Sequence, residues 1–175
     1  MYRTLKRAME LLENIGTFAA SGFLVVMTFL ICLDALGRYL LNRPIGFTYE
    51  LTELFLMVGI VYLGTSYTFR EGGHVKVEFL EKRLSPVPRL LVKILIHFLA
   101  AWFIGLLAYL TWKGMMHSYR LKHVSPGMLE FPLWYSYLVM FAGVGLLCVR
   151  LALEGIDACV ELIRKRVSAV RKTLP

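Results

Sequence analysis

The sequence predicts an all-α integral membrane protein with four transmembrane helices, because apolar residues dominate it and its charges are unevenly spaced. Of its 175 residues, 58% are hydrophobic and 18% are charged, whereas soluble domains carry about a quarter charged residues; the mean hydropathy is +0.63. The charged residues leave four uncharged stretches: 14–33, 54–69, 94–112 and 131–149. Because a bilayer core needs about 20 mostly apolar helical residues, these stretches predict four spans and exclude a soluble enzyme domain.

The predicted organisation is a single four-span membrane domain over residues 1–175. The spans are expected at about 15–39, 49–69, 90–112 and 131–152. Span two fits only if Glu50 and Glu53 lie at the membrane interface, since its uncharged stretch is the shortest. The remaining segments are predicted to be an amphipathic N-terminal segment at 1–14, an interfacial helix at 75–84 and a basic tail at 154–175.

The distribution of basic residues predicts the topology. With four spans, the two termini and the middle loop share one side of the membrane, and that side collects 15 of the 20 Lys and Arg residues. The positive-inside rule then places both termini and the 75–84 helix in the cytoplasm. Basic residues in these positions are expected to interact with the lipid bilayer, which is therefore a predicted partner. No nucleic acid partner is expected.

The chain carries no recognisable catalytic or cofactor motif. It has no nucleotide-binding, metalloprotease or serine-hydrolase signature, and its three cysteines show no metal-ligand spacing. His97 is the one histidine inside a predicted span, where it is expected to make a polar contact between helices. No enzyme activity, cofactor or metal is therefore expected. A stand-alone small four-helix carrier and a haem-bearing membrane anchor remain the alternative functions.

Charged residues gather around the predicted first hairpin. Asp34 and Arg38 are spaced i, i+4 and can pair along one helix. Glu50 and Glu53 begin span two, close to Arg38 across the turn. These charges predict either a clamp within the hairpin or a docking surface for a partner subunit, and their spacing does not decide between the two.

Two neighbouring segments of the chain resemble the small membrane subunit of TRAP transporters, the tripartite ATP-independent periplasmic systems. The segments are Arg38–Leu54 (RYLLNRPIGFTYELTEL) and Tyr67–Val77 (YTFREGGHVKV). That family carries an RY-x-x-N-x-P block, then Glu-Leu in span two, then Arg and Gly-Gly-His in the cytoplasmic loop. The positions that match are Arg38, Tyr39, Asn42, Pro44, Glu50, Arg70, Gly73 and His74.

The resemblance implies a function. The small subunit is expected to act in the bacterial cell inner membrane as a scaffold for a large multispan subunit that translocates the solute. A periplasmic solute-binding protein would deliver the solute, typically an organic acid, and ion gradients would drive its uptake by secondary transport. The matching residues, together with Glu53, are the candidates for contacts with partners or for structural roles.

Overall fold

The computed structural model describes residues 2–72, 86–127 and 130–173. Apart from one isolated β-bridge between Val124 and Pro132, all regular structure in these residues is helical. The elements are α1 (Tyr2–Leu41), α2 (Thr48–Leu51), the π-helical turn η1 (Thr52–Leu56), α3 (Met57–Arg70), α5 (Pro86–Arg120) and α6 (Trp134–Thr173). The predicted interfacial helix at 75–84 lies outside the described residues.

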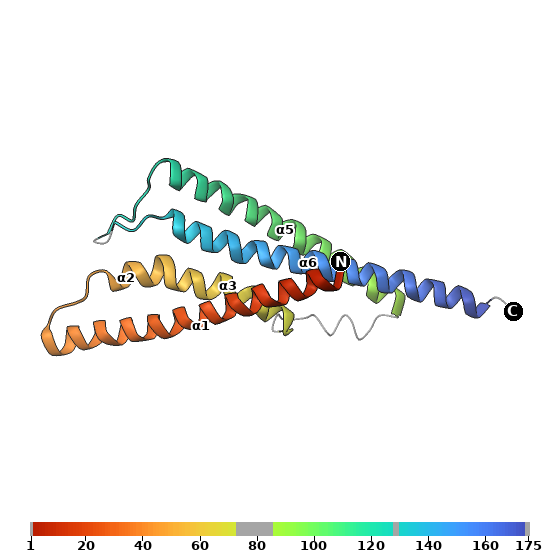
Figure 1. Cartoon of the computed structure of the whole chain (residues 1–175), viewed down its shortest axis with the longest axis horizontal. Coiled ribbons are helices and arrows are strands. Elements are labelled where there is room, and N and C mark those ends of the chain that lie inside the picture. The colour runs from red at the N-terminus through yellow and green to blue at the C-terminus, as the bar shows by residue number, and fades with distance from the viewer. Residues whose placement is uncertain (1, 73–85, 128–129, 174–175) are drawn as a thin grey trace.

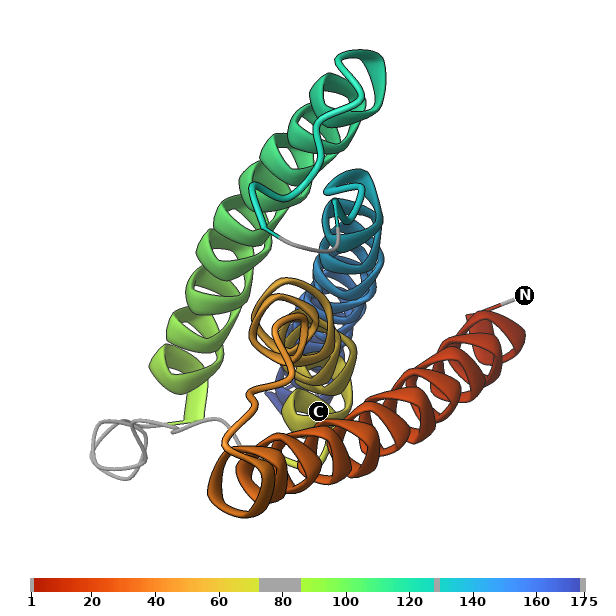
Figure 2. The same cartoon turned by 90° about the vertical axis from the view of Figure 1, so that its left-hand side faces the viewer.

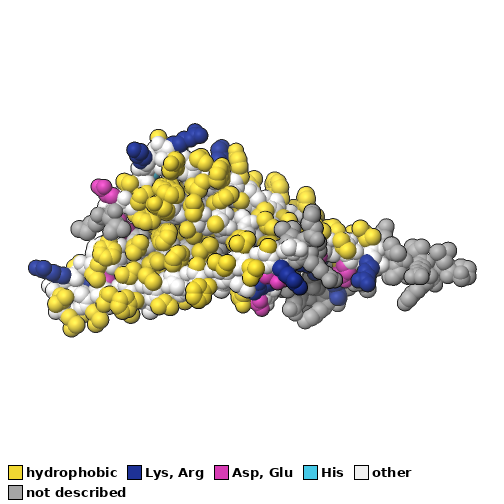
Figure 3. All heavy atoms as spheres, in the orientation of Figure 1, with side chains coloured by type: hydrophobic (Ala, Val, Ile, Leu, Met, Phe, Trp, Pro, Cys, Tyr) yellow, Lys and Arg dark blue, Asp and Glu magenta, His cyan; other side chains and the backbone are white. Residues whose placement is uncertain are grey.

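Four helical stretches are long and apolar enough to cross a membrane: Lys6–Leu41, Thr48–Arg70, Pro88–Arg120 and Trp134–Arg164. The second is built from α2, η1 and α3 in succession. In the space-filling view, hydrophobic side chains cover most of the visible face of the bundle, and charged side chains gather toward its two ends (Figure 3). The all-helical class and the four long apolar helices are therefore confirmed.

The helices are arranged with α3 and α6 in the middle and α1 and α5 on opposite sides (Figures 1 and 2). Helix α1 packs on α3, α3 packs on α6, and α6 packs on α5. The last turns of α6 extend alone past the bundle (Figure 1). Helix α1 is continuous from Tyr2, so the amphipathic N-terminal segment and the first apolar stretch form a single helix.

Small residues let the middle helices approach closely. A Cβ atom at Gly143 of α6 would lie 2.2 Å from the carbonyl oxygen of Tyr62 in α3. A Cβ atom at Gly59 of α3 would lie 2.2 Å from the ring of Phe23 in α1. Because lipid tails are as apolar as the side chains, close packing of this kind is a main source of helix association in membranes.

The π-helical turn η1 lies where α6 contacts the second helical stretch. The hydroxyl of Ser136 in α6 donates a hydrogen bond to the backbone carbonyl of Leu54 within η1. A side chain that bonds to a helical carbonyl is a recognised cause of local departures from α-helical geometry. Phe55 of the same turn contacts Phe23 and Phe131, with ring centroids 5.3 and 5.6 Å apart, so η1 joins α1 to the segment just before α6.

The helices end where the backbone turns into the left-handed region. Helix α1 stops before Asn42, whose φ is +51°, and Pro44 follows. Helix α3 is closed by Gly72 with φ +75°, whose N–H donates to the carbonyl of Phe69 at 3.1 Å. Asn and Gly are the residues that adopt this conformation most readily. The first and second apolar stretches are thereby joined by a connection of only six residues, 42–47.

Candidate functional site

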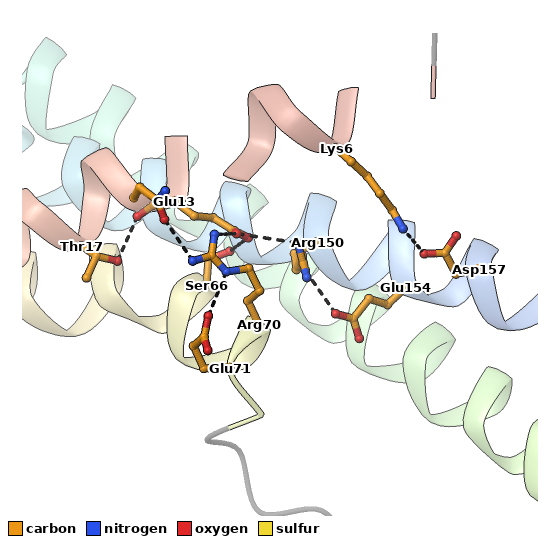
Figure 4. A network of polar contacts seen from close by, with 10 residues as sticks. Lys6, Glu13, Thr17, Ser66, Arg70, Glu71, Arg150, Glu154 and Asp157 are labelled. Atoms are coloured by element: carbon orange, nitrogen blue, oxygen red, sulfur yellow. Dashed lines mark hydrogen bonds and ion pairs between the residues drawn. The ribbon is translucent and has the colours of Figure 1, made fainter. Parts of the chain in front are cut away.

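A cluster of charged side chains joins α1, α3 and α6 at one end of the bundle (Figure 4). We call it the Glu13 cluster; it comprises Glu13, Ser66, Arg70, Arg150 and Glu154. The side chain of Glu13 is completely buried. Its Oε1 accepts a hydrogen bond from the Ser66 hydroxyl at 2.8 Å. Its Oε2 lies 3.3 Å from Nη1 of Arg70 and 3.7 Å from Nη1 of Arg150.

The cluster extends to the fourth helix. Nε of Arg150 donates to Oε1 of Glu154 at 3.1 Å, and Oε2 of Glu154 lies 3.5 Å from Nε2 of His97 in α5. The expected polar contact between helices at His97 is therefore present. Further along α6, Asp157 forms an ion pair with Lys6 of α1. One connected set of polar and charged side chains thus reaches all four long helices.

The arrangement explains how a carboxylate tolerates full burial. An isolated buried carboxylate is very costly, whereas one paired with cations and hydrogen bonded is tolerated. Glu13 has both, because one oxygen is hydrogen bonded by Ser66 and the other faces two guanidinium groups. Arg70 is held further by a hydrogen bond from its Nη2 to Oδ1 of Asn14 at 3.0 Å. The cluster is therefore a structural joint between helices.

A second polar group closes the first hairpin at the opposite end of α1. Asp34, which is 8% exposed, pairs with Arg38 at 2.8 Å along the helix, as the i, i+4 spacing predicts. Its other oxygen accepts the backbone N–H of Ile45 at 2.7 Å. The N–H of Arg43 is bonded to the carbonyl of Gly37 at 3.1 Å. Asp34 therefore ties the returning chain to the end of α1.

Glu50 lies against the connection between α5 and α6. Its Oε2 accepts a hydrogen bond from the hydroxyl of Ser125 at 3.3 Å. Gly127 allows this approach, because a Cβ atom there would fall 1.7 Å from Oε1 of Glu50. The contacts described for Arg38 and Glu50 thus lead to different elements. Whether the two residues act together at a partner interface stays a prediction.

The other residues named from the sequence lie in varied surroundings. Tyr39 is 90% exposed at the end of α1. Asn42 and Pro44 are exposed in the hairpin connection, and Glu53 is exposed on η1. Arg70 is the one that enters the Glu13 cluster. Gly73 and His74 lie outside the described residues.

The two polar groups are spaced to match a bilayer. Glu13 and Asp34 are 21 residues apart on one continuous helix, and a rise of 1.5 Å per residue makes this about 32 Å. The hydrocarbon core of a typical bilayer is about 30 Å thick. The uncharged stretch of α1 is thus long enough to span the core, with a buried acidic residue near each of its ends.

Sequence reasoning identified Arg70 but not its partners. Glu13 and Arg150 each border an uncharged stretch, and Glu154 lies one turn beyond Arg150. On sequence alone such residues look like ordinary interfacial charges. One signal was available, since Glu13 and Arg150 lie at the membrane boundary on the side that the positive-inside rule assigns to the termini. The pairing of particular charges depends on which helices pack together, and no spacing along the chain records that.

The described residues hold no group of three or more His, Cys, Asp or Glu side chains placed to bind a metal ion. The long apolar helices, with polar groups at both ends, define a multi-pass membrane protein. Residues 27–159 match the family described as "Tripartite ATP-independent periplasmic transporters, DctQ component". The chain belongs to this family, the DctQ component of TRAP transporters. The predicted family is confirmed.

One relative is the "C4-dicarboxylate TRAP transporter small permease protein DctQ" of Rhodobacter capsulatus. It is 33% identical to this chain over 97 residues. The aligned region covers 55% of this chain and 42% of the relative, so this chain matches less than half of that protein's length.

Proposed function

We propose that this chain is the scaffold of its transporter and anchors a large multispan subunit. The large subunit translocates the solute, which a periplasmic solute-binding protein delivers to it. The observation that carries the proposal is the Glu13 cluster. Around the buried Glu13 it links α1, α3 and α6 through ion pairs, and the contact of Glu154 with His97 adds α5 at the same end. A subunit that itself moved solute would instead be expected to place ionisable groups near the membrane midplane.

The surface of the bundle supports an anchoring role. Large apolar side chains on α1 are strongly exposed, among them Phe18 at 83% and Val25 at 69%. Similar side chains on α5 are exposed as well, including Phe98 at 69% and Trp102 at 65%. The two helices lie on opposite sides of the bundle (Figure 2). The exposed side chains of one helix can contact lipid while those of the other contact a larger membrane subunit.

The solute is proposed to be an organic acid, and a C4-dicarboxylate is the first to test because the Rhodobacter capsulatus relative bears that name. The direct experiment has two stages. A tagged form of this chain is purified from its native membrane, and a much larger hydrophobic protein is expected with it. The large subunit and the binding protein are then reconstituted with and without this chain, and succinate uptake is measured under an ion gradient.

Uptake is expected only with all three components. Uptake by this chain alone would instead favour the stand-alone carrier, and visible absorbance from the purified chain would favour the haem-bearing anchor. Equal uptake with and without this chain, or purification with no large partner, would refute the scaffold proposal.

The proposed location is the bacterial inner membrane with both termini in the cytoplasm. The support is the excess of basic residues at the termini and the middle loop, which puts the Glu13 cluster at the cytoplasmic boundary and Asp34 at the periplasmic one. Single cysteines at Ser85 or Ser168, in a chain lacking Cys32, Cys148 and Cys159, should resist impermeant labelling in intact spheroplasts. External labelling at either position would overturn this topology.

A further inference from the structure

A cavity of about 210 Å³ lies beside the Glu13 cluster and is lined mainly by charged side chains. Its lining residues are Lys6, Lys93, Arg150, Leu153, Glu154 and Asp157; we call it the Lys93 pocket. Because one water takes up about 30 Å³ in the liquid, the pocket has room for a group of several heavy atoms. The side chains of Lys6 and Asp157 are 37% and 42% exposed, so the pocket opens to the outside.

Three helices build the pocket. Four of its residues come from α6 at positions 150, 153, 154 and 157, a spacing that places them on one helical face. Lys6 is contributed by α1 and Lys93 by α5, the two helices that lie on opposite sides of the bundle (Figure 2). Figure 4 shows the Lys6 to Asp157 and Arg150 to Glu154 pairs that border it. A ligand bound there would contact α1, α5 and α6 together.

The charges of the lining favour an anion. Three cations face two carboxylates, and each carboxylate already has a basic partner: Asp157 pairs with Lys6, and Glu154 with Arg150. The third cation is Lys93. Within the part of the chain that the structure describes, the ammonium group of Lys93 forms no ion pair. The contact of Lys93 with His97 is made by its backbone carbonyl, which lies 2.8 Å from Nδ1 of His97. An ammonium group at the edge of an apolar helix is stabilised by a negatively charged ligand.

The position of the pocket indicates which anion. Lys93 and Arg150 immediately border the uncharged stretches 94–112 and 131–149, so they lie at the depth where lipid phosphates meet the acyl chains. Within a turn of Lys93, Leu95 and Ile96 are 57% and 53% exposed and offer apolar surface for an acyl chain. A small dissolved anion has no acyl chain that could be buried against that apolar surface.

We propose that the Lys93 pocket binds the phosphate group of an anionic phospholipid, with Lys93, Lys6 and Arg150 as the cationic contacts. The lipid bridges α1 and α5 across α6 at the end where the Glu13 cluster holds the helices. Binding of a ligand to the folded state stabilises it by mass action, so the stability of this chain depends on the anionic lipid content of its membrane. This inference does not rest on the transport role.

The experiment measures the thermal unfolding of the full chain in neutral detergent micelles as phosphatidylglycerol is added. The variant is Lys93→Gln, and the matched control is Lys113→Gln, which removes a lysine from the other end of the same helix. Since one Lys near an anionic membrane surface contributes about a fivefold change in affinity, half of the maximal shift should require about fivefold more phosphatidylglycerol in Lys93→Gln. Lys113→Gln and Lys93→Arg should behave as wild type.

Two further probes identify the ligand on the wild-type chain, whether or not Lys93→Gln folds. Phosphatidylcholine, which has no net charge, should shift the unfolding temperature much less than phosphatidylglycerol, and inorganic phosphate should not shift it. Equal shifts from the two lipids would show a general lipid effect, and an equal shift from inorganic phosphate would show a soluble-anion site. Either result would overturn the proposal, as would an unchanged phosphatidylglycerol response in Lys93→Gln.

Discussion

The Glu13 cluster predicts a large loss of stability from a small chemical change. Glu13→Gln keeps the size of the side chain and leaves a carbonyl oxygen that can still accept the hydrogen bond from Ser66. It removes the one negative charge that faces both Arg70 and Arg150. The two guanidinium groups then repel each other with no carboxylate between them.

The expected cost follows from the burial of the three groups. Removing one partner of a buried ion pair destabilises a protein by about 3–5 kcal/mol. The arginine side chains are 18% and 15% exposed, and each keeps a second carboxylate, Glu71 for Arg70 and Glu154 for Arg150. We therefore expect the lower end, about 3 kcal/mol. Glu10→Gln is the matched control, because Glu10 lies one turn away on α1 and is exposed; substitutions at such surface positions typically change stability by less than about 0.5 kcal/mol.

The assay is unfolding of the purified chain in mixed detergent micelles, with the free energy of unfolding compared between the two variants. A double-mutant cycle with Arg70→Gln should show a coupling of about 0.5–3 kcal/mol, as for residues in direct contact. If Glu13→Gln and Glu10→Gln unfold alike, or if Glu13 and Arg70 show no coupling, the buried joint is refuted.

Three other substitutions test the remaining contacts. Asp34→Ala leaves the N–H of Ile45 without its carboxylate acceptor and should reduce stability by about 1–3 kcal/mol, seen as faster proteolysis of the hairpin. Asp34→Asn should reduce stability less. Equal proteolysis rates for both variants and wild type would contradict the role of Asp34 in holding the hairpin. Gly143→Val should disrupt packing of α6 on α3, where the Cβ would meet the Tyr62 carbonyl, whereas Gly145→Val enters open space; equal unfolding temperatures would count against that contact. Glu50→Gln should impair uptake in the three-component system if Glu50 docks a partner. The charge swap Arg38→Glu with Glu50→Arg should restore uptake only if the two residues clamp the hairpin. Wild-type uptake in both Arg38→Gln and Glu50→Gln would exclude both roles.

Several features could be read from the sequence because they depend on neighbours along the chain. The four apolar stretches follow from the spacing of charges. A charge inside a bilayer core is costly, so each span must be nearly free of charged residues within its own segment. The pairing of Asp34 with Arg38 follows from the geometry of a single helix, and the end of α1 follows from Asn42 and Pro44. The motif residues of the two segments Arg38–Leu54 and Tyr67–Val77 were enough to indicate the family.

The joints between helices were decided only by the tertiary structure. Glu13, Ser66 and Arg150 are far apart in the chain, and each alone reads as a residue near a membrane boundary. They meet because close contacts such as that of Gly143 with Tyr62 bring α6 against α3, and because α1 packs on α3. The sequence by itself determined how many helices could cross a bilayer and where their charges stop. Which charges become partners depends on the order in which the helices pack, because a buried charge is stabilised only by the groups that the fold brings within a few ångströms of it.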